Sequence, residues 1–375
     1  MGKKQKAGFI LGLIVLLMSV LGCKKKQTSE INGEPSNDLV QFEKTESTIT
    51  VTPTKEPTPT EAPSHDGMAR SLLTGEWVDE AVAKQRPFAV MLNNITFANP
   101  QSGIGDADIL YEAIVEGGIT RLMGIYGNID PSSNTAKRLG SVRSARHYYV
   151  SFADEYDAIF VHFGQTSYAI KKMKKLGIDT INGMQGVGGN SFYRDNKIKK
   201  PHNAFTSLKG LQDAVEKGKY RTTYKENYEG HFAFYETDTD LKGDSAQKIK
   251  FKYSKVITPV LQYDGSTKEY LRFQYDGPHI DYNTKEQLHF KNIIVQFVKE
   301  WNIDKNGYQT MDIEDASGDG YYITNGVLTK ITWKKNESTK TMRYYDADGK
   351  ELTINPGKTF ISIFPNNRVN DVIVE

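Results

Sequence analysis

Residues Asp106–Tyr126 read DADILYEAIVEGGITRLMGIY, and this stretch has the clearest strand-and-turn pattern in the first folded domain. Two runs rich in β-branched and aromatic residues flank Gly117-Gly118. Glycine readily adopts the positive φ angles that a two-residue hairpin turn requires. The pattern therefore predicts a β-hairpin in which Glu116 faces Ile119 and every other pair follows by counting outward.

The predicted register places charged side chains on one face of the hairpin. Ile114 faces Arg121 and Glu112 faces Met123, and residues that face each other point to the same side of a sheet. Arg121 is then diagonal to both Glu112 and Glu116. The candidate binding residues of the hairpin are Glu112, Glu116, Thr120 and Arg121.

Polar residues precede the hairpin in two places. Asn94 follows a predicted buried strand over 89–92, and Gln101 lies in the loop Asn99–Gly103. Because this loop leads into the hairpin, its polar side chains are expected near Glu112 or Arg121. Asn94 and Gln101 are therefore further candidate binding residues, although the same residue types also suit turns.

The segment Ala145–Tyr156 has aromatic side chains three and four residues apart, the spacing of one helix face. Ser141 or Ser144 is expected to cap this helix. A helix start exposes unpaired N–H groups and the positive end of the macrodipole, and Arg143 and Arg146 stand beside it. Arg143, Ser144 and Arg146 therefore predict a site for a carboxylate or phosphate. The alternative is that the two arginines pair with the hairpin glutamates in a closed interior.

Two histidines follow in the same part of the chain. His162 lies near the end of a predicted strand over 157–164, and His202 lies in Pro201-His202-Asn203. Imidazole can serve as a general base or a metal ligand. Neither histidine has a recognised ligand spacing, so we predict no metal site and no cofactor. His162 and His202 are candidate catalytic residues, and each also suits a hydrogen-bonded structural role.

The amino-terminal segment predicts export and lipidation. Basic residues precede an apolar run over 7–20, which is short for a membrane span of roughly 20 residues, and Val20-Leu21-Gly22-Cys23 follows. A signal peptidase is expected to remove residues 1–22, after which the thiol and new amino group of Cys23 carry acyl chains such as palmitate. The sequence thus predicts a protein held in the lipid bilayer of the cell membrane, on its outer, extracytoplasmic face.

Composition divides the remaining chain into a tether and two domains. Residues 23–76 are rich in Ser, Thr, Pro and charged residues, which predicts a disordered tether with a reach on the order of 40 Å. Residues 77–228 combine strands with helices, whereas 229–375 read mostly as strands. The expected fold class is α+β, with a layered sheet-and-helix N-terminal domain before a smaller β-rich C-terminal domain. The helices are expected over 145–156, 167–176 and 207–217.

Charge and cysteine content exclude several classes of protein. The 48 basic and 46 acidic residues are balanced, which argues against a nucleic-acid binder. Cys23 is the single cysteine, so an exported protein of this sequence has no disulfide, no thiol nucleophile and no cysteine metal cluster.

Motifs spread over the folded part carry a resemblance to a known family. They are Arg86–Met91, Pro100–Gly103, Ala107–Arg121, Val142–Arg146, Pro201–Asn203, Asn292–Gln296, Gly318–Gly320, Trp333–Lys335 and Asp348–Lys358. In these motifs the chain resembles the YerB-like lipoproteins of bacteria. The resemblance implies a two-part α/β and β architecture on a lipid anchor, and it carries over no catalytic or ligand-binding residue.

Three functions are compatible with these patterns. The leading hypothesis is a binding or accessory protein that holds an anionic or peptide-like envelope ligand, such as a cell-wall polymer, or an envelope protein. The second is a cell-wall hydrolase that uses Glu112 and Glu116 as acid and base. Their Cα atoms are about 13 Å apart in a straight strand, which is wide for glycosidase carboxyl groups about 5 to 9.5 Å apart. The third is a structural lipoprotein that bridges partners. The lack of a complete catalytic set in the sequence favours a protein that is not an enzyme.

Overall fold

The computed structural model describes residues 64–336 and 341–375. The predicted signal peptide, the predicted lipidated Cys23 and most of the predicted tether lie outside these residues. Ordered structure begins before the predicted boundary at residue 77, because β1 (Met68–Arg70) pairs with β2 (Trp77–Asp79) and the side chain of Leu73 between them is buried in a core.

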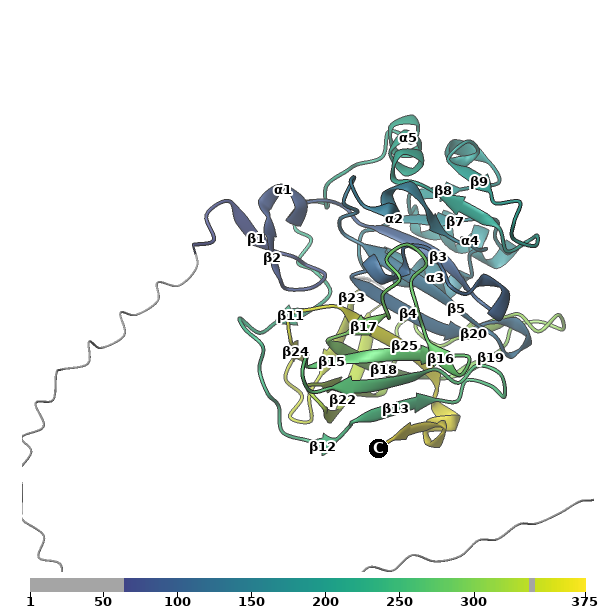
Figure 1. Cartoon of the computed structure of the whole chain (residues 1–375). Coiled ribbons are helices and arrows are strands. Elements are labelled where there is room, and N and C mark those ends of the chain that lie inside the picture. The colour runs from purple at the N-terminus through teal and green to yellow at the C-terminus, as the bar shows by residue number, and fades with distance from the viewer. Residues whose placement is uncertain (1–63, 337–340) are drawn as a thin grey trace, which may run out of the picture. The chain divides into compact units, whose positions relative to one another are not determined.

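An eleven-stranded mixed sheet runs through the described residues (Figure 1). β25 lies in its middle and pairs in parallel with β18 on one side and with β4 on the other. Strands from the predicted domains 77–228 and 229–375 therefore form one continuous sheet. In order the strands are β12 (Asp244–Ser245), β22 (Val327–Asn336), β21 (Ser317–Thr324), β18 (Asn292–Val298), β25 (Thr359–Pro365), β4 (Ile109–Ile114), β5 (Thr120–Tyr126), β3 (Phe88–Asn94), β7 (Ile159–His162) and β8 (Thr180–Asn182), with β23 (Thr341–Tyr345) beside β22.

A second, six-stranded sheet comes from the C-terminal part of the described chain. Its strands are β16 (Gly277–Pro278), β15 (Glu269–Gln274), β14 (Val260–Asp264), β13 (Lys248–Phe251) and β26 (Val372–Val374), with β17 (His289–Phe290) beside β15. Shorter pairings join β6 (Leu139–Gly140), β10 (Ala204–Thr206) and β9 (Phe192–Arg194), β11 (Ala233–Phe234) and β24 (Thr353–Ile354), and β19 (Glu300–Asn302) and β20 (Gln309–Met311).

The α-helices of the described residues all lie in the first half of the folded part. They are α1 (Glu80–Ala83), α2 (Asn134–Lys137), α3 (His147–Asp154), α4 (Ser167–Leu176) and α5 (Leu208–Gly218). Short 3₁₀ turns are η1 (Thr96–Ala98), η2 (Ile104–Asp106), η3 (Glu116–Gly118), η4 (Gly186–Gly188) and η5 (Asn366–Asp371). The fold is α+β and mostly β, as the sequence predicts.

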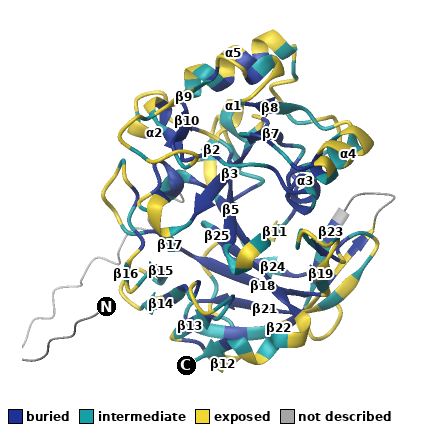
Figure 2. Ribbon diagram, turned by 90° about the vertical axis from the view of Figure 1, so that its right-hand side faces the viewer, coloured by how far each residue is buried: buried dark blue, intermediate teal, exposed yellow. Residues whose placement is uncertain are grey.

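The large sheet is covered on both faces, so its strands are buried (Figure 2). On one face, Leu110 and Leu122 share a hydrophobic core with Ile249 of the second sheet and with α5. On the other face, Tyr111 and Met123 pack with the aromatic side chains of α3. We call these the second-sheet face and the α3 face.

Most predicted helices and strands are confirmed where their bounds or burial depend on a local sequence pattern. α4 begins at Ser167 after its cap Thr166 and ends before Gly177, which has a φ of 66°. In β22, Ile331 and Trp333 are buried and their neighbours are exposed, as the alternation predicts. The predicted cap of the helix near residue 145 is wrong, because Arg146 occupies the N-cap position of α3 and no side chain caps it.

The predicted hairpin is confirmed, but its register is wrong by one residue. Gly117 and Gly118 have φ angles of 73° and 70°, as the turn requires. However, the Val115 N–H donates to the Ile119 carbonyl, so the loop holds three residues and includes Glu116. Glu112 consequently pairs with Leu122 and Ala113 with Arg121. A shift of one residue exchanges the faces, so Glu112 and Arg121 point to opposite sides of the sheet.

Candidate functional site

Glu112 lies at the centre of a buried polar network on the second-sheet face. Its side chain and that of Arg272 on β15 are both 0% exposed, and Glu112 Oε2 accepts from Arg272 Nη2 at 2.6 Å. Glu112 Oε1 accepts from Thr120 Oγ1 at 2.6 Å and from Asn94 Nδ2 at 3.0 Å. Three candidate binding residues, Asn94, Glu112 and Thr120, thus gather around a buried ion pair. The predicted register placed Thr120 on the face away from Glu112, and the observed register brings the two together.

His279 extends this network to the loop before the hairpin. Arg272 Nη1 donates to His279 Nδ1 at 3.0 Å and to Gln274 Oε1 at 2.8 Å. Since Nδ1 accepts, the His279 hydrogen is on Nε2, which donates to Gln101 Oε1 at 2.7 Å. Burial holds the pKa of His279 well below its usual range, so the ring is neutral. We call the seven residues Asn94, Gln101, Glu112, Thr120, Arg272, Gln274 and His279 the Glu112 network.

The Glu112 network joins the two parts of the folded chain, residues 77–228 (the first part) and residues 229–375 (the second part). Asn94, Gln101 and Glu112 come from the first part, and Arg272 and His279 come from the second. The local sequence does not point to Arg272, because alternation in β15 favours burial of Leu271 and Phe273. The structure instead buries Tyr270, Arg272 and Gln274. The His279 side chain is 0% exposed and hydrogen-bonds both to Arg272 on β15 and to Gln101 in the loop before the hairpin.

Arg121 lies on the α3 face, next to the start of α3. Its side chain is 5% exposed, and its Nη1 donates to the Ser144 carbonyl at 2.5 Å. Burial, followed by the nearby charge of Arg146, lowers the pKa of Arg121 to about 9. The prediction that Arg121 shares a face with Glu112 is therefore wrong, and the structure places Arg121 beside Ser144 and Arg146 instead.

Arg146 pairs with Glu116 at the hairpin tip. Arg146 Nε donates to Glu116 Oε1 at 2.6 Å and Arg146 Nη2 donates to Oε2 at 2.7 Å, which is a two-pronged ion pair. Partial burial acts to raise the pKa of Glu116, but the Arg146 guanidinium outweighs it and lowers that pKa. The alternative of arginine–glutamate pairing is thus confirmed for Arg146, and this arginine is largely neutralised.

Arg143 is left without an acidic partner among the described residues. Its Nη1 donates to the Pro201 carbonyl at 3.2 Å, while no acceptor in the described part of the chain reaches its buried Nε. Burial, followed by the charges of Arg146 and Arg194, lowers the pKa of Arg143. We call Arg121, Arg143, Arg146 and Arg194 the arginine cluster.

Two polar side chains, Asn93 and His202, lie next to the arginine cluster. Asn93 pairs with Arg121 in the sheet, and its Nδ2 lies 2.9 Å from His202 Nδ1. Burial, followed by the charge of Arg143, lowers the pKa of His202. Asn94, not Asn93, was the candidate binding residue predicted from the sequence. Strand alternation directs Asn93 toward Arg121 and Asn94 toward Glu112.

His162 lies apart from these residues, at the end of β7. Its side chain is 0% exposed and it lines a cavity with residues of α4 and β8.

The two carboxylates predicted as acid and base, Glu112 and Glu116, lie apart from each other. Glu112 is enclosed by Arg272 on one face, and Glu116 is paired with Arg146 beside the other. The arrangement therefore offers no shared centre for Glu112 and Glu116.

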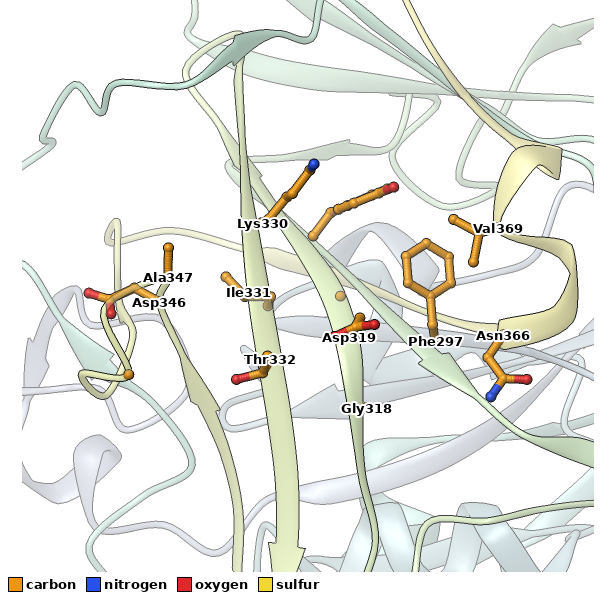
Figure 3. A pocket seen from close by; sticks show the side chains of 13 residues that line it. Phe297, Gly318, Asp319, Lys330, Ile331, Thr332, Asp346, Ala347, Asn366 and Val369 are labelled. Carbon is orange, nitrogen blue, oxygen red and sulfur yellow. The ribbon is translucent and has the colours of Figure 1, made fainter.

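The C-terminal part carries a groove of about 650 Å³ that none of the predicted site residues lines (Figure 3). Asp319, Lys330 and Thr332 extend from β21 and β22, between Asp346 on one side and Asn366 on the other (Figure 3). Asp346 is used by its own turn, because its Oδ1 accepts from the Asp348 and Lys350 N–H groups.

No cluster of three or more His, Cys, Asp or Glu side chains is arranged to hold a metal ion within 64–336 and 341–375. In the same residues, no helix has the length and apolar character needed to cross a bilayer.

Comparison with known proteins defines the class to which this fold belongs. Residues 73–221 match the N-terminal domain, and residues 249–361 the C-terminal domain, of the family described as protein of unknown function DUF3048. The chain therefore belongs to this two-domain family.

A relative and a solved structure narrow the comparison. The chain is 32% identical over 298 residues to the putative lipoprotein YerB of Bacillus subtilis (strain 168), which covers 78% of this chain and 86% of that protein. The crystal structure of YerB from Bacillus subtilis matches with a TM-score of 0.72 and 29% identity, covering 82% of this chain and 99% of YerB. The resemblance to YerB-like lipoproteins is thereby confirmed.

Proposed function

We propose that the chain is a lipid-anchored extracytoplasmic binding or accessory protein that holds an anionic envelope ligand at the arginine cluster. The observation that carries this proposal is Arg143, whose buried Nε has no acceptor within the described residues. A buried donor without a partner costs free energy, which an anionic ligand would recover.

The charge around Arg143 supports an anion. The cluster contains four guanidinium groups, and Glu116 forms its two-pronged pair with just one of them. Burial is the largest cause of the lowered pKa values of Arg121 and Arg143, and the charge of Arg146 is the next for both. An anion placed beside these arginines would therefore be stabilised. Asn93 and His202 lie next to the cluster, where they can position a carboxylate or phosphate.

Replacement of Arg143 by glutamine is expected to weaken retention on isolated cell-wall fragments about tenfold or more, because a hydrogen bond to a charged group contributes about 1.5–3 kcal/mol. Arg143→Gln removes one charge and leaves the Arg146–Glu116 pair intact. The measurement is a pull-down of the full chain on wall fragments at low and high salt.

Lys217→Gln is the matched control, because Lys217 is exposed on α5 and its replacement removes the same charge. Equal retention of Arg143→Gln and the wild type would reject the arginine cluster as the ligand site. Loss of retention in Lys217→Gln as well would indicate attraction by net charge alone.

The lipid anchor is tested separately by replacement of Cys23. The Cys23→Ser variant is expected to leave the membrane fraction almost completely, because it lacks the thiol that carries the first acyl chain. The measurement is fractionation of cells followed by an alkaline wash of the membranes. Ser29→Ala in the same segment is the control, and a Cys23→Ser protein that stays in washed membranes would contradict acylation at Cys23.

A further inference from the structure

A cavity of about 450 Å³ lies between α4 and the edge strand β8. His162 and Asn182 line it from paired positions of β7 and β8, and Ile170, Met173 and Lys174 line it from α4. None of these residues belongs to the arginine cluster or the Glu112 network. The cavity is within the size range of small-molecule sites, which is about 300–1,000 Å³.

His162 is one of the residues that line this cavity, and one of its ring nitrogens is an acceptor without a partner among the described residues. Its Nδ1 lies 2.9 Å from the Gly164 carbonyl, and a carbonyl only accepts, so the ring hydrogen is on Nδ1. Burial lowers the pKa of His162 to about 4, so the ring is neutral at neutral pH. Nε2 therefore carries a lone pair, and no donor in 64–336 or 341–375 reaches it, although the side chain is 0% exposed.

The neighbouring amides are arranged so that one donor remains at the cavity. Asn182 Oδ1 accepts from the Gly164 and Met184 N–H groups, which fixes the orientation of this amide. Asn182 Nδ2 then donates to Gln165 Oε1 at 2.7 Å. Because its oxygen is occupied by Asn182, Gln165 can offer its amino group to a ligand.

These features select a class of ligand. A lone pair at His162 Nε2 repels an anion, and Lys174 disfavours a cation. A single imidazole is a poor metal site, because structural metal sites in proteins use about four ligands. The remaining class is a neutral molecule that donates a hydrogen to Nε2, accepts from Gln165, and lays an apolar side against Ile170 and Met173.

We propose that this cavity binds a neutral, hydroxyl-rich ligand, a sugar residue, with one hydroxyl donating to His162 Nε2. A pyranose ring has hydroxyl groups at its edges and C–H groups on its faces, which matches the polar and apolar sides of the cavity. The site is independent of the arginine cluster, so the failure of either proposal leaves the other in place.

The test is saturation-transfer NMR of the full chain in detergent micelles, with glucose and N-acetylglucosamine as probes. Saturable binding is expected for at least one of them. Fully O-methylated glucose, which has no hydroxyl hydrogen, is expected to bind at least fivefold more weakly. Failure of both sugars to bind, or equal binding of the methylated sugar, would overturn the proposal.

Variants locate the binding. His162→Phe removes the lone pair and is expected to abolish sugar binding. Ile170→Trp leaves His162 in place but fills the cavity from a side chain that is 49% exposed, so it is expected to do the same without disturbing the core. Lys171→Trp, one residue further along α4 and exposed, is the matched control and is expected to bind like the wild type. Wild-type binding by a folded Ile170→Trp variant would place the sugar elsewhere and reject the site.

Discussion

Replacement of Arg272 by alanine is expected to lower the free energy of unfolding by about 3–5 kcal/mol, because it leaves Glu112 as a buried charge without its cation. Glu112 Oε2 lies 2.6 Å from Arg272 Nη2, and both side chains are 0% exposed. His279 would also lose the donor to its Nδ1. The measurement is urea unfolding of the full chain, compared with the wild type at pH 7.

Two controls show whether the loss comes from an uncompensated charge. The double variant Glu112→Leu with Arg272→Met removes both charges and is expected to be clearly more stable than Arg272→Ala, since apolar replacement of a whole buried pair is often neutral or stabilising. Lys84→Ala breaks an exposed ion pair with Glu80 and is expected to leave the unfolding midpoint unchanged. An Arg272→Ala variant as stable as the wild type would show that the Glu112 network does not hold the two parts together.

Acidification is expected to remove about 3.5 kcal/mol of stability through His162 alone. Burial lowers its pKa from 6.5 to about 4 in the folded chain. Between these values the unfolded chain binds more protons than the folded chain, so stability rises with pH in this window. The contribution is complete above pH 6.5 and is lost as the pH falls through 4. The shift of about 2.5 pH units at about 1.4 kcal/mol each gives the magnitude.

Urea unfolding midpoints at intervals from pH 7 to pH 4 test this prediction. The His162→Gln variant has no group that titrates in this range at that position, so its stability should fall less steeply than that of the wild type. Carboxylates titrate in the same range, and comparison of the two proteins cancels their contribution. Parallel curves for the two proteins would show that folding does not lower the pKa of His162.

The two faces of one hairpin have different roles in this structure. On the second-sheet face, Glu112 is committed to Arg272 and joins the two parts of the chain. On the α3 face, Arg121 approaches Ser144 and stands near Arg143, which lacks an acidic partner among the described residues. The proposed binding function therefore uses Arg143, whose charge has no acidic partner among the described residues. The Glu112–Arg272 ion pair contributes to stability instead.

Local elements were predictable because their determinants are adjacent in sequence. The bounds of α4 follow from its cap Thr166 and from Gly177, and the burial of Ile331 and Trp333 follows from strand alternation. Short strands such as β17 and β24 were missed, because two residues are too few to show a period. The contact of Arg121 with Ser144 was not predicted, because it depends on the face of the hairpin that Arg121 occupies.

The sequence alone determined the α+β class, the hairpin, the main helices and the family, since all of these depend on residue type and spacing. Only the tertiary structure decided the register, because one additional loop residue, Glu116, exchanges the faces of every side chain on a strand. It also decided the partner of Glu112, because Arg272 is 160 residues away along the chain and meets it only where two sheets pack. Long-range pairing of this kind leaves no local pattern, and it separates the buried Glu112 network from the arginine cluster.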